Sequence, residues 1–441
     1  MTSFISSTST SSHISAVAEH ERVFGFFEHL SLWFSLSVGL LVIQLGAYLF
    51  PAMGTHDALS STVIGSCLGA TCLAYVAHLG SKTGLSSAGL IQQAFGRSFA
   101  RLPVSFNVIQ LLGWAAFELV VMRDGLAAIL KGSFGLDGHW LTVLCTLILG
   151  GLLAALSQLS MLRLARKVVS RVGLPLVLVS LLWFSAHFMT KIMQMPEGFS
   201  GFMAFQGDGS MPYALALDLV VAMPVSWLPL VADYARFSKR SKTSGAHSKS
   251  AFNGTWLGYA VANIWCYGLG FVVMATMPGD QDLINTLLLA QFGLIALTFI
   301  LIDEMDNAYG DMYSGSVSLN HMVPKMNTHQ WGLIFSFVAT LAALVLPMHS
   351  LEPFLLILSS IFIPLFAVVG VYMCLEYPAS HSTIRLINVP SVCLWVVGIM
   401  VYHISPMYFP NAGSTLPCLA VTVLLSACWF LFSKARVMVD A

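Results

Sequence analysis

Twelve stretches of the chain are apolar and long enough to cross a membrane, and only short polar segments separate them. A helix of about 20 apolar residues spans the hydrocarbon core of a bilayer. Only 9% of the residues are charged, against about 25% in a typical soluble domain. The chain is therefore predicted to be an all-α polytopic membrane protein. Its transmembrane helices are expected at about 30–51, 60–80, 104–129, 139–158, 172–190, 212–234, 255–277, 284–309, 331–348, 353–375, 388–405 and 415–433.

The distribution of basic residues predicts how these helices are oriented. If the N-terminus is cytoplasmic, only three of the 20 lysines and arginines fall outside, namely Arg123, Lys131 and Lys191. Cytoplasmic loops carry the excess of basic residues in membrane proteins. We therefore expect a multi-pass protein of the cytoplasmic (inner) membrane with both termini inside.

The segments between the apolar stretches are too short for a separate soluble domain. We expect a cytoplasmic tail at 1–28, a single transmembrane domain at 29–435 and a cytoplasmic C-terminus at 436–441. The tail lacks the basic start and cleavage site of a secretory signal. Besides membrane lipid and a small ligand, no partner is predicted, neither nucleic acid nor an obligate protein.

Helix-breaking residues occur in the first and sixth stretches. The first contains Gly39, Gly46 and Pro51, and the sixth contains Pro224 and Pro229. Breakers in corresponding segments are typical of inverted-repeat transporters, whose broken helices free carbonyl groups for a cation and N-termini for polar substrate groups. Glycine and proline are also common in continuous membrane helices. The pattern favours discontinuous helices 1 and 6, with Gly39 at a cation-binding break.

The third stretch places an aromatic ring beside an acid. Trp114 and Glu118 are four residues apart and share one helical face. A flat heterocycle could stack on the indole while the carboxylate accepts from an amino group, as it does with cytosine N4. Gln44, near the first break, could read another edge of the ring. The alternatives are packing for Trp114, a buried pair with a cation such as Arg123 for Glu118, and a helix–helix hydrogen bond for Gln44.

The eighth stretch ends in an acidic cluster. Asp303, Asn307 and Asp311 follow an i, i+4, i+8 spacing, with Asp306 one turn from Asp303, and Glu304 is expected to face elsewhere. Acids inside a bilayer are costly and usually functional. Their oxygens suit small hard cations, and closely spaced carboxylates can also share a proton. The alternative is a solvated helix end.

Signals for an enzyme are absent from the sequence. It contains no HExxH, GxSxG or P-loop motif and no dinucleotide-binding glycine motif between a strand and a helix. The eight cysteines show no metal-type spacing. We therefore expect no catalysis and no cofactor.

Three motifs carry a resemblance to a known family. They are KTGLSSAGLIQQAFGRSFARLP (82–103), SWLPLVADYARFSK (226–239) and LIDEMDNAYGDMYSGSVSLN (301–320). They resemble the nucleobase:cation symporter family of the purine–cytosine permease type. The third motif is similar to the branch that holds probable hydroxymethylpyrimidine and cytosine transporters.

This resemblance implies the leucine-transporter-like fold. Two inverted five-helix repeats, at about 29–190 and 212–375, would precede two extra helices at about 388–433. It also implies inward transport of a nucleobase-type heterocycle by alternating access. Trp114 matches the stacking tryptophan of the family, and Gln44 matches a glutamine that reads the substrate. The substrate-binding set is then Gln44, Trp114, Glu118, Pro224, Trp227 and Asn307.

The chain departs from the family at two points. Members often have glutamine where this chain has Glu118, which favours a 4-aminopyrimidine such as cytosine or hydroxymethylpyrimidine. A purine, allantoin or hydantoin carrier and a non-transporting receptor remain alternatives. Sodium-coupled members carry hydroxyl residues on helix 8, whereas this chain has Asp306 and Asn307 there. The coupling ion is left open between sodium near Asp306 and a proton, with Gly39, Asp303, Asp306 and Asn307 as the coupling residues.

Overall fold

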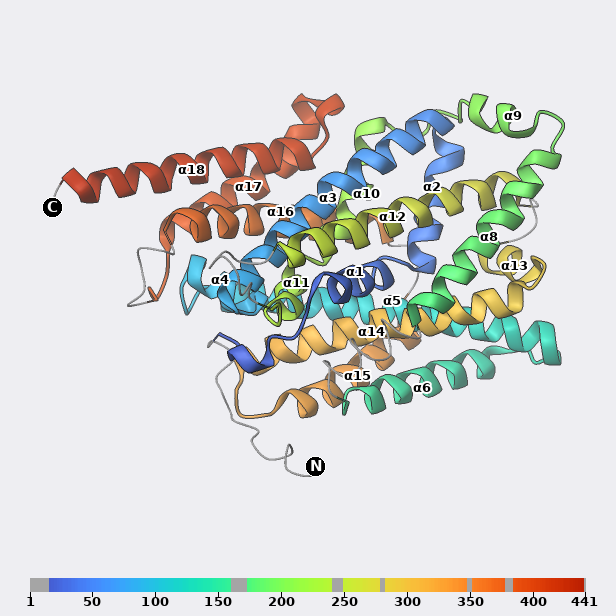
Figure 1. Cartoon of the computed structure of the whole chain (residues 1–441), viewed down its shortest axis with the longest axis horizontal. Coiled ribbons are helices and arrows are strands. Elements are labelled where there is room, and N and C mark those ends of the chain that lie inside the picture. The colour runs from blue at the N-terminus through green and yellow to red at the C-terminus, as the bar shows by residue number, and fades with distance from the viewer. Residues whose placement is uncertain are drawn as a thin grey trace.

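Helices make up the regular structure of this chain, and no strand occurs in the part that the computed structural model describes, residues 16–159, 173–239, 249–277, 282–346, 351–376 and 384–439 (Figure 1). The long helices are α3 (Thr55–Thr83), α5 (Arg101–Phe134), α6 (His139–Leu156), α8 (Leu174–Gln194), α12 (Ser250–Thr276), α14 (Gly293–Met322), α15 (Thr328–Val345), α16 (Leu351–Leu375), α17 (Val389–Tyr408) and α18 (Thr415–Val439). The shorter ones are α1 (Phe26–Ser35), α2 (Leu40–Ala52), α4 (Ser87–Phe95), α9 (Gly198–Ala204), α10 (Tyr213–Ser226), α11 (Leu228–Ala235) and α13 (Leu283–Leu289). The outer ends of both predicted tails, 1–15 and 440–441, lie outside the described residues.

Each of the twelve predicted segments overlaps a helix. In the described residues ten spans are long and apolar enough to cross a membrane, and the pair α1 and α2 forms an eleventh with a bend of 60°. Helix α14 is not in this set, although its 30 residues are about 45 Å long. It carries four carboxylates, Asp303, Glu304, Asp306 and Asp311, and is therefore too rich in charge to count among these spans. Three of these carboxylates, all but that of Asp306, belong to buried residues.

The predicted eighth segment, 284–309, differs most from the structure. It is divided between α13 and α14 at Phe292, whose φ of 57° lies in the left-handed region. Helix α14 then continues to Met322. Its last turns contain small residues, and Gly315 lets the Phe335 ring of α15 approach so closely that a Cβ would collide with it. Hydropathy falls in these turns, but tight packing of small residues extends the helix.

The first transmembrane helix is discontinuous between Ser35 and Leu40, as predicted. Gly39 is the residue that precedes α2, with an extended backbone. Gly46 is not part of this break. A Cβ there would overlap the Tyr267 carbonyl of α12, so Gly46 instead lets α2 pack closely on α12. The sixth helix is not broken in this way. Helices α10 and α11 meet at Trp227, whose backbone stays in the right-handed helical region, and together they form one 23-residue span.

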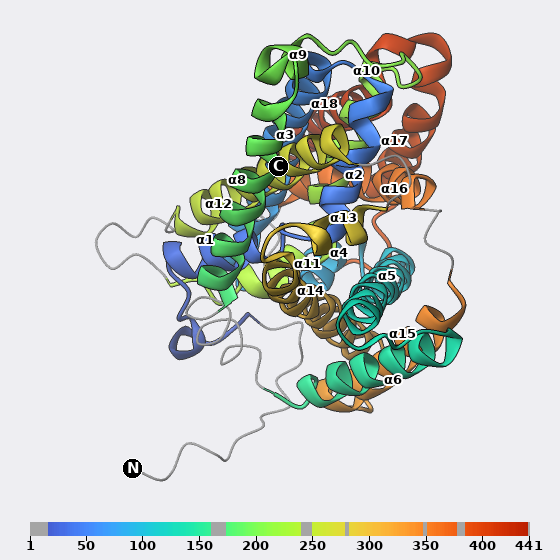
Figure 2. The ribbon, with the colours of Figure 1, turned by 90° about the vertical axis from the view of Figure 1, so that its right-hand side faces the viewer.

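The first and sixth transmembrane helices pack in a reciprocal way. Helices α1 and α2 lie on α12, whereas α10 and α11 lie on α3. Helices α5 and α14 run along each other, and α16, α17 and α18 form a group at one edge of the bundle in both views (Figures 1 and 2). This reciprocity is what an inverted repeat requires. The repeat boundaries stay a prediction.

Asp218 of α10 connects the edge group to the sixth transmembrane helix. The side chain is 4% exposed. It accepts hydrogen bonds from the backbone N–H groups of Ser414, at 2.7 Å, and Thr415, at 2.9 Å. These groups begin α18 and have no partner within their own helix. Asp218 therefore caps α18 from a neighbouring helix.

Replacing Asp218 by alanine is expected to lower the thermal stability of the protein in detergent. Two buried N–H groups lose their acceptor, at about 1–3 kcal/mol each. The measurement is the denaturation midpoint, with Asp57→Ala on the exposed first turn of α3 as the matched control. Equal midpoints for the two variants would show that the cap contributes nothing.

Candidate functional site

A small cavity lies beside the break in the first helix. Its volume is about 20 Å³, which is room for about one water molecule and not for a heterocyclic ring. The site is therefore closed in this conformation. The cavity is lined by Leu36, Val38, Gly39, Leu41 and Val42 at the break, Trp114 and Glu118 of α5, Met223 and Trp227 near the junction of α10 and α11, and Asn307 of α14.

Helix α5 presents Trp114 and Glu118 to this cavity because they are one turn apart on its buried face. The Trp114 ring meets Phe354 of α16 edge to face, with centroids 5.3 Å apart. Three polar atoms around the cavity are buried without a hydrogen-bond partner in the described part of the chain: the Trp114 indole nitrogen, Glu118 Oε2 and Asn307 Oδ1. Buried polar atoms rarely stay unpaired, so these atoms are the natural contacts for a bound ligand.

The break itself is held by α14. The backbone N–H of Leu40 donates to Glu304 Oε1. The Asn307 amide donates to the Val38 carbonyl at 3.0 Å and to Glu304 Oε2 at 3.3 Å. Gly39 makes this approach possible, because a Cβ there would lie 3.1 Å from Glu304 Oε1. The polar groups exposed by the break are thus satisfied by two side chains of α14.

The junction of α10 and α11 is held in the same way by α5. The Gln110 amide donates to the Ser226 carbonyl at 2.9 Å. The Asn107 amide donates to the Pro229 carbonyl at 3.4 Å and to Ser318 at 3.2 Å. The helix-1 break and this junction are therefore each braced by side chains of a helix from the other proposed repeat.

The prediction that Glu304 faces away is wrong, since its carboxyl contacts the break. At about 100° per residue, Glu304, Asn307 and Asp311 lie within about 60° of one another on α14. By spacing alone, either Asp303 or Glu304 could share a helical face with Asn307 and Asp311. The position of the helix-1 break shows that the face with Glu304 is the one that contacts it.

The two acids expected to couple the cation have different neighbours, although both lie beside one cavity. Asp303 accepts a hydrogen bond from Ser35 Oγ at the end of α1, so it is next to the break. Asp306 instead lines a separate apolar cavity of about 470 Å³ between α5, α6, α8 and α14, which Asp303 also borders. Within the described ranges, no group of three or more His, Cys, Asp or Glu side chains is arranged to hold a metal ion.

Two residues of the predicted substrate set do not line the small cavity. Gln44 is half-buried on α2, beyond the lining residues Leu41 and Val42. Pro224 packs against Gly69 of α3, so closely that a Cβ on Gly69 would collide with the proline ring. Trp114, Glu118, Trp227 and Asn307 are brought together with Gly39 at the cavity.

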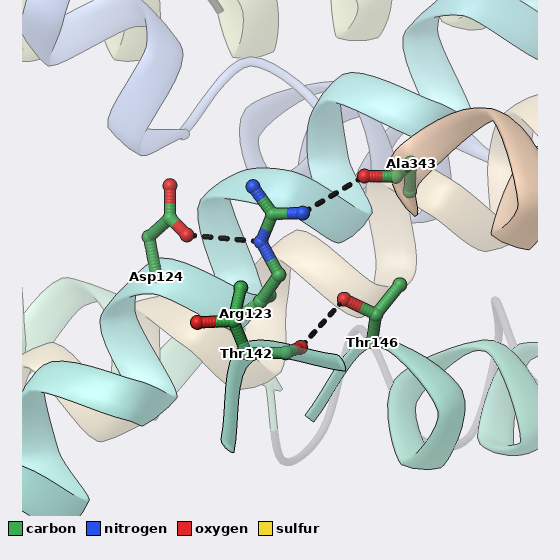
Figure 3. Close-up of polar contacts among 5 residues, drawn as sticks. All are labelled: Arg123, Asp124, Thr142, Thr146 and Ala343. Carbon is green, nitrogen blue, oxygen red and sulfur yellow. Dashed lines mark hydrogen bonds and ion pairs between the residues drawn. The ribbon is translucent and has the colours of Figure 1, made fainter. Parts of the chain in front are cut away.

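Arg123 is the cation closest in sequence to Glu118, and it is engaged elsewhere. Its Nε forms an ion pair with Asp124 at 2.9 Å, and its Nη1 donates to the Ala343 carbonyl of α15 at 2.8 Å (Figure 3). Among the residues that the structure describes, the other ion pair is Lys131 with Asp137. The alternative in which Arg123 pairs with Glu118 is therefore excluded in this conformation.

The chain was compared with known protein families and solved structures. Residues 16–424 match the sequence model of one family, which is described as permeases for cytosine/purines, uracil, thiamine and allantoin. No curated protein matches the chain. The chain is similar to the structure of Mhp1, a nucleobase-cation-symport-1 family transporter, in a closed conformation with bromovinylhydantoin bound, with a TM-score of 0.81, 14% identity and coverage of 97% of this chain and 95% of that one.

Two further structures share the fold. The inward-facing conformation of Mhp1 has a TM-score of 0.77 at 15% identity, with coverage of 96% of this chain and 93% of that one. The substrate-bound outward-open state of a Na+-coupled sialic acid symporter has a TM-score of 0.63 at 10% identity, with coverage of 94% and 91%.

Proposed function

Since the chain belongs to the family of permeases for cytosine/purines, uracil, thiamine and allantoin, we propose that it imports a 4-aminopyrimidine, such as cytosine or hydroxymethylpyrimidine, together with a cation. The observation that carries this proposal is the cavity at the helix-1 break. It combines two indole rings with two unpaired acceptors and one unpaired donor.

The unpaired atoms favour a ligand with an exocyclic amine. Glu118 Oε2 and Asn307 Oδ1 both need a donor, and an amino group supplies two N–H bonds. The Trp114 indole N–H needs an acceptor, such as a ring nitrogen or carbonyl. A uracil ring has a carbonyl where cytosine has its amine, and would bring another acceptor toward the carboxyl. Trp114 and Trp227 provide aromatic surfaces between which a flat ring can stack.

Transport requires the cavity to open, because it now holds no more than about one water molecule. Phe354 of α16 packs edge to face against Trp114. Gly39 and Trp227 line the cavity together with Trp114. In alternating access the site stays near the midplane while the two repeats rock around it. We propose that both termini are cytoplasmic. A membrane potential that is negative inside favours inward transport of a cation by about 2.3 kcal/mol per charge for each 100 mV.

The cation site predicted from the sequence is retained as a proposal in altered form. The Asp303 carboxyl is adjacent to the helix-1 break through Ser35. Asp306 lies beside the larger cavity. A sodium ion near Asp306 would therefore lie at this larger cavity, and Asp303, which also borders the cavity, would connect it to the break.

A ligand-ranking experiment tests the proposed role of Glu118. The Glu118→Leu variant is expected to bind cytosine at least about tenfold more weakly, since loss of an acceptor to a buried donor costs about 1–3 kcal/mol. Uracil should be affected less. Glu118→Gln replaces one acceptor oxygen by an amide N–H donor and is expected to shift the preference away from aminopyrimidines. Competition binding of cytosine, hydroxymethylpyrimidine, uracil, hypoxanthine, allantoin and hydantoin measures it. An equal loss for all six ligands would rule out Glu118 as the group that selects the amine.

A further inference from the structure

The larger cavity beside α14 differs from the small one at the helix-1 break in size and in lining. Its volume is about 470 Å³, and pockets of about 300–1,000 Å³ hold drug-sized ligands. Helices α5, α6 and α8 line it with apolar side chains such as Leu126, Leu152 and Val177. The two carboxyl groups at the cavity, those of Asp303 and Asp306, both come from α14. The larger cavity is therefore mainly apolar, with acidic groups on one wall.

The packing of the neighbouring helices explains why this space is left. Helix α6 lies on α5 and α15, whereas α8 lies on α12 and α14. In both views α14 runs between α8 and α6 (Figures 1 and 2). One face of α14, with Ile302, Asp306 and Tyr309 spaced by three to four residues, borders the cavity. The larger cavity is the space that α6 and α8 leave on this face.

The larger cavity has an opening toward the lipid-facing surface. Leu152 of α6 and Ile302 of α14 border it and are 47% and 57% exposed. A second hollow along α5 and α14 shares Ile129 and Phe299 with it and reaches the exposed side chain of Phe134. Lipid tails are as apolar as these side chains. A molecule dissolved in the bilayer can therefore enter the cavity without passing through water.

Two carboxyl oxygens at the larger cavity lack a hydrogen-bond partner. Asp303 is 5% exposed, and its Oδ1 accepts a hydrogen bond. Its Oδ2 and the Oδ2 of Asp306 are buried and unpaired in the part of the chain that the structure describes. Both ion pairs of the described ranges involve other acids, and Arg123 pairs with Asp124 (Figure 3). Since buried polar atoms rarely stay unpaired, these oxygens point to a donor from a ligand.

We propose that the larger cavity binds a protonated lipophilic amine, an alkylammonium or arylalkylammonium ion that enters from the bilayer. An ammonium group has three N–H donors and no acceptor, so it can satisfy both Asp303 and Asp306. The apolar walls can bury its hydrocarbon part. Tyr309 lies one turn from Asp306 and adds an aromatic ring beside the same place. This site is separate from the cavity at the helix-1 break and goes beyond the proposed function.

Two other occupants use only part of this site. The acyl chain of a lipid matches the apolar walls, but it leaves both carboxyl oxygens without a donor, which is unfavourable in apolar surroundings. The inorganic cation predicted near Asp306 would use the carboxyl group and leave the apolar volume empty. The amine and that cation would compete for Asp306, so the test is made without sodium.

A photoreactive decylamine tests the site directly. The protein is reconstituted in sodium-free phosphatidylcholine nanodiscs and illuminated with decylamine that carries a diazirine in its chain, and the labelled residues are mapped by mass spectrometry. Labelling is expected on cavity residues, among them Leu152 and Ile302. Unlabelled decylamine should reduce it at least about tenfold, while decanol, which has the same chain without the charge, should reduce it much less.

Three variants separate the carboxyl group from the apolar space. Asp306→Asn removes the charge with little change in shape and should lower the labelling at least about tenfold. Leu152→Trp narrows the opening and keeps both carboxyls, and it should also lower the labelling. Asp57→Asn makes the same Asp-to-Asn change on the exposed first turn of α3 and should label like wild type. The thermal midpoint of each variant shows whether it is folded.

Three results would overturn the proposal. Equal competition by decanol and decylamine would mean that the cavity holds an acyl chain without reading a charge. Labelling of exposed apolar residues elsewhere, such as Val179 and Leu182 of α8, as strongly as the cavity would mean that the amine only dissolves in the bilayer. Wild-type labelling of folded Asp306→Asn would mean that this carboxyl does not bind the amine. No heterocycle is present in these experiments, so their result is independent of the proposed function.

Discussion

Replacement of Glu304 by leucine is expected to abolish cytosine accumulation in proteoliposomes. The variant leaves the Leu40 N–H and one Asn307 N–H without their acceptor. Each unpaired buried group costs about 1–3 kcal/mol, so the helix-1 break should rearrange. Uptake is expected to fall by more than about a hundredfold, and the thermal midpoint should fall as well.

Two further variants make the Glu304 result interpretable. Glu304→Gln keeps one acceptor oxygen for the Leu40 N–H, and should remain folded and keep more of the uptake than Glu304→Leu. Glu197→Leu makes the same Glu-to-Leu change at an exposed position before α9, and should transport normally. Wild-type accumulation by Glu304→Leu would mean that the contact between α14 and the break has no role in transport.

Replacement of Trp114 by alanine is expected to weaken binding of all planar ligands by about tenfold to a hundredfold. Stacking of a base on an aromatic side chain contributes about 1–3 kcal/mol, and it does not depend on the edge of the ring. The ranking of ligands should therefore survive while every affinity falls, in contrast to Glu118→Leu. Equilibrium binding of labelled cytosine with competitors measures both quantities.

The control for Trp114 is Trp429→Ala on α18, a half-exposed indole at the edge of the bundle. It should leave affinity unchanged. Trp114→Phe keeps an aromatic face and should lose less than the alanine variant. A selective loss of aminopyrimidines in Trp114→Ala would contradict a stacking role, because it would make the indole a reader of the ring edge.

The sequence could predict the helices because the requirement for a membrane span is local. A run of about 20 apolar residues is sufficient, and all twelve predicted segments overlap helices. The C-terminal end of α14 could not be predicted from apolar residues in this way. Its final turns are polar in sequence and are kept helical by close packing around Gly315. The extra short helices α4 and α9 are likewise too short for this criterion.

The candidate site was predictable where spacing along one helix was sufficient. Trp114 and Glu118 share a face by their spacing alone. The position of Gln44 and the orientation of Glu304 depend on how α2 and α14 pack together. The spacing of residues along each helix does not show this packing. Gln110 and Asn107 were missed for the same reason. Their sequence signal is a pair of amides, three residues apart, in an apolar helix.

The most direct test of the account is a thermal-shift panel on the purified protein with the six heterocycles, each with and without sodium at two pH values. A ligand that binds only the folded state at a hundredfold excess over its Kd stabilises it by about 2.7 kcal/mol. The proposed function predicts shifts for cytosine and hydroxymethylpyrimidine, and the dependence of these shifts on sodium or on pH identifies the coupled ion. Shifts confined to purines, allantoin or hydantoin would contradict the substrate assignment.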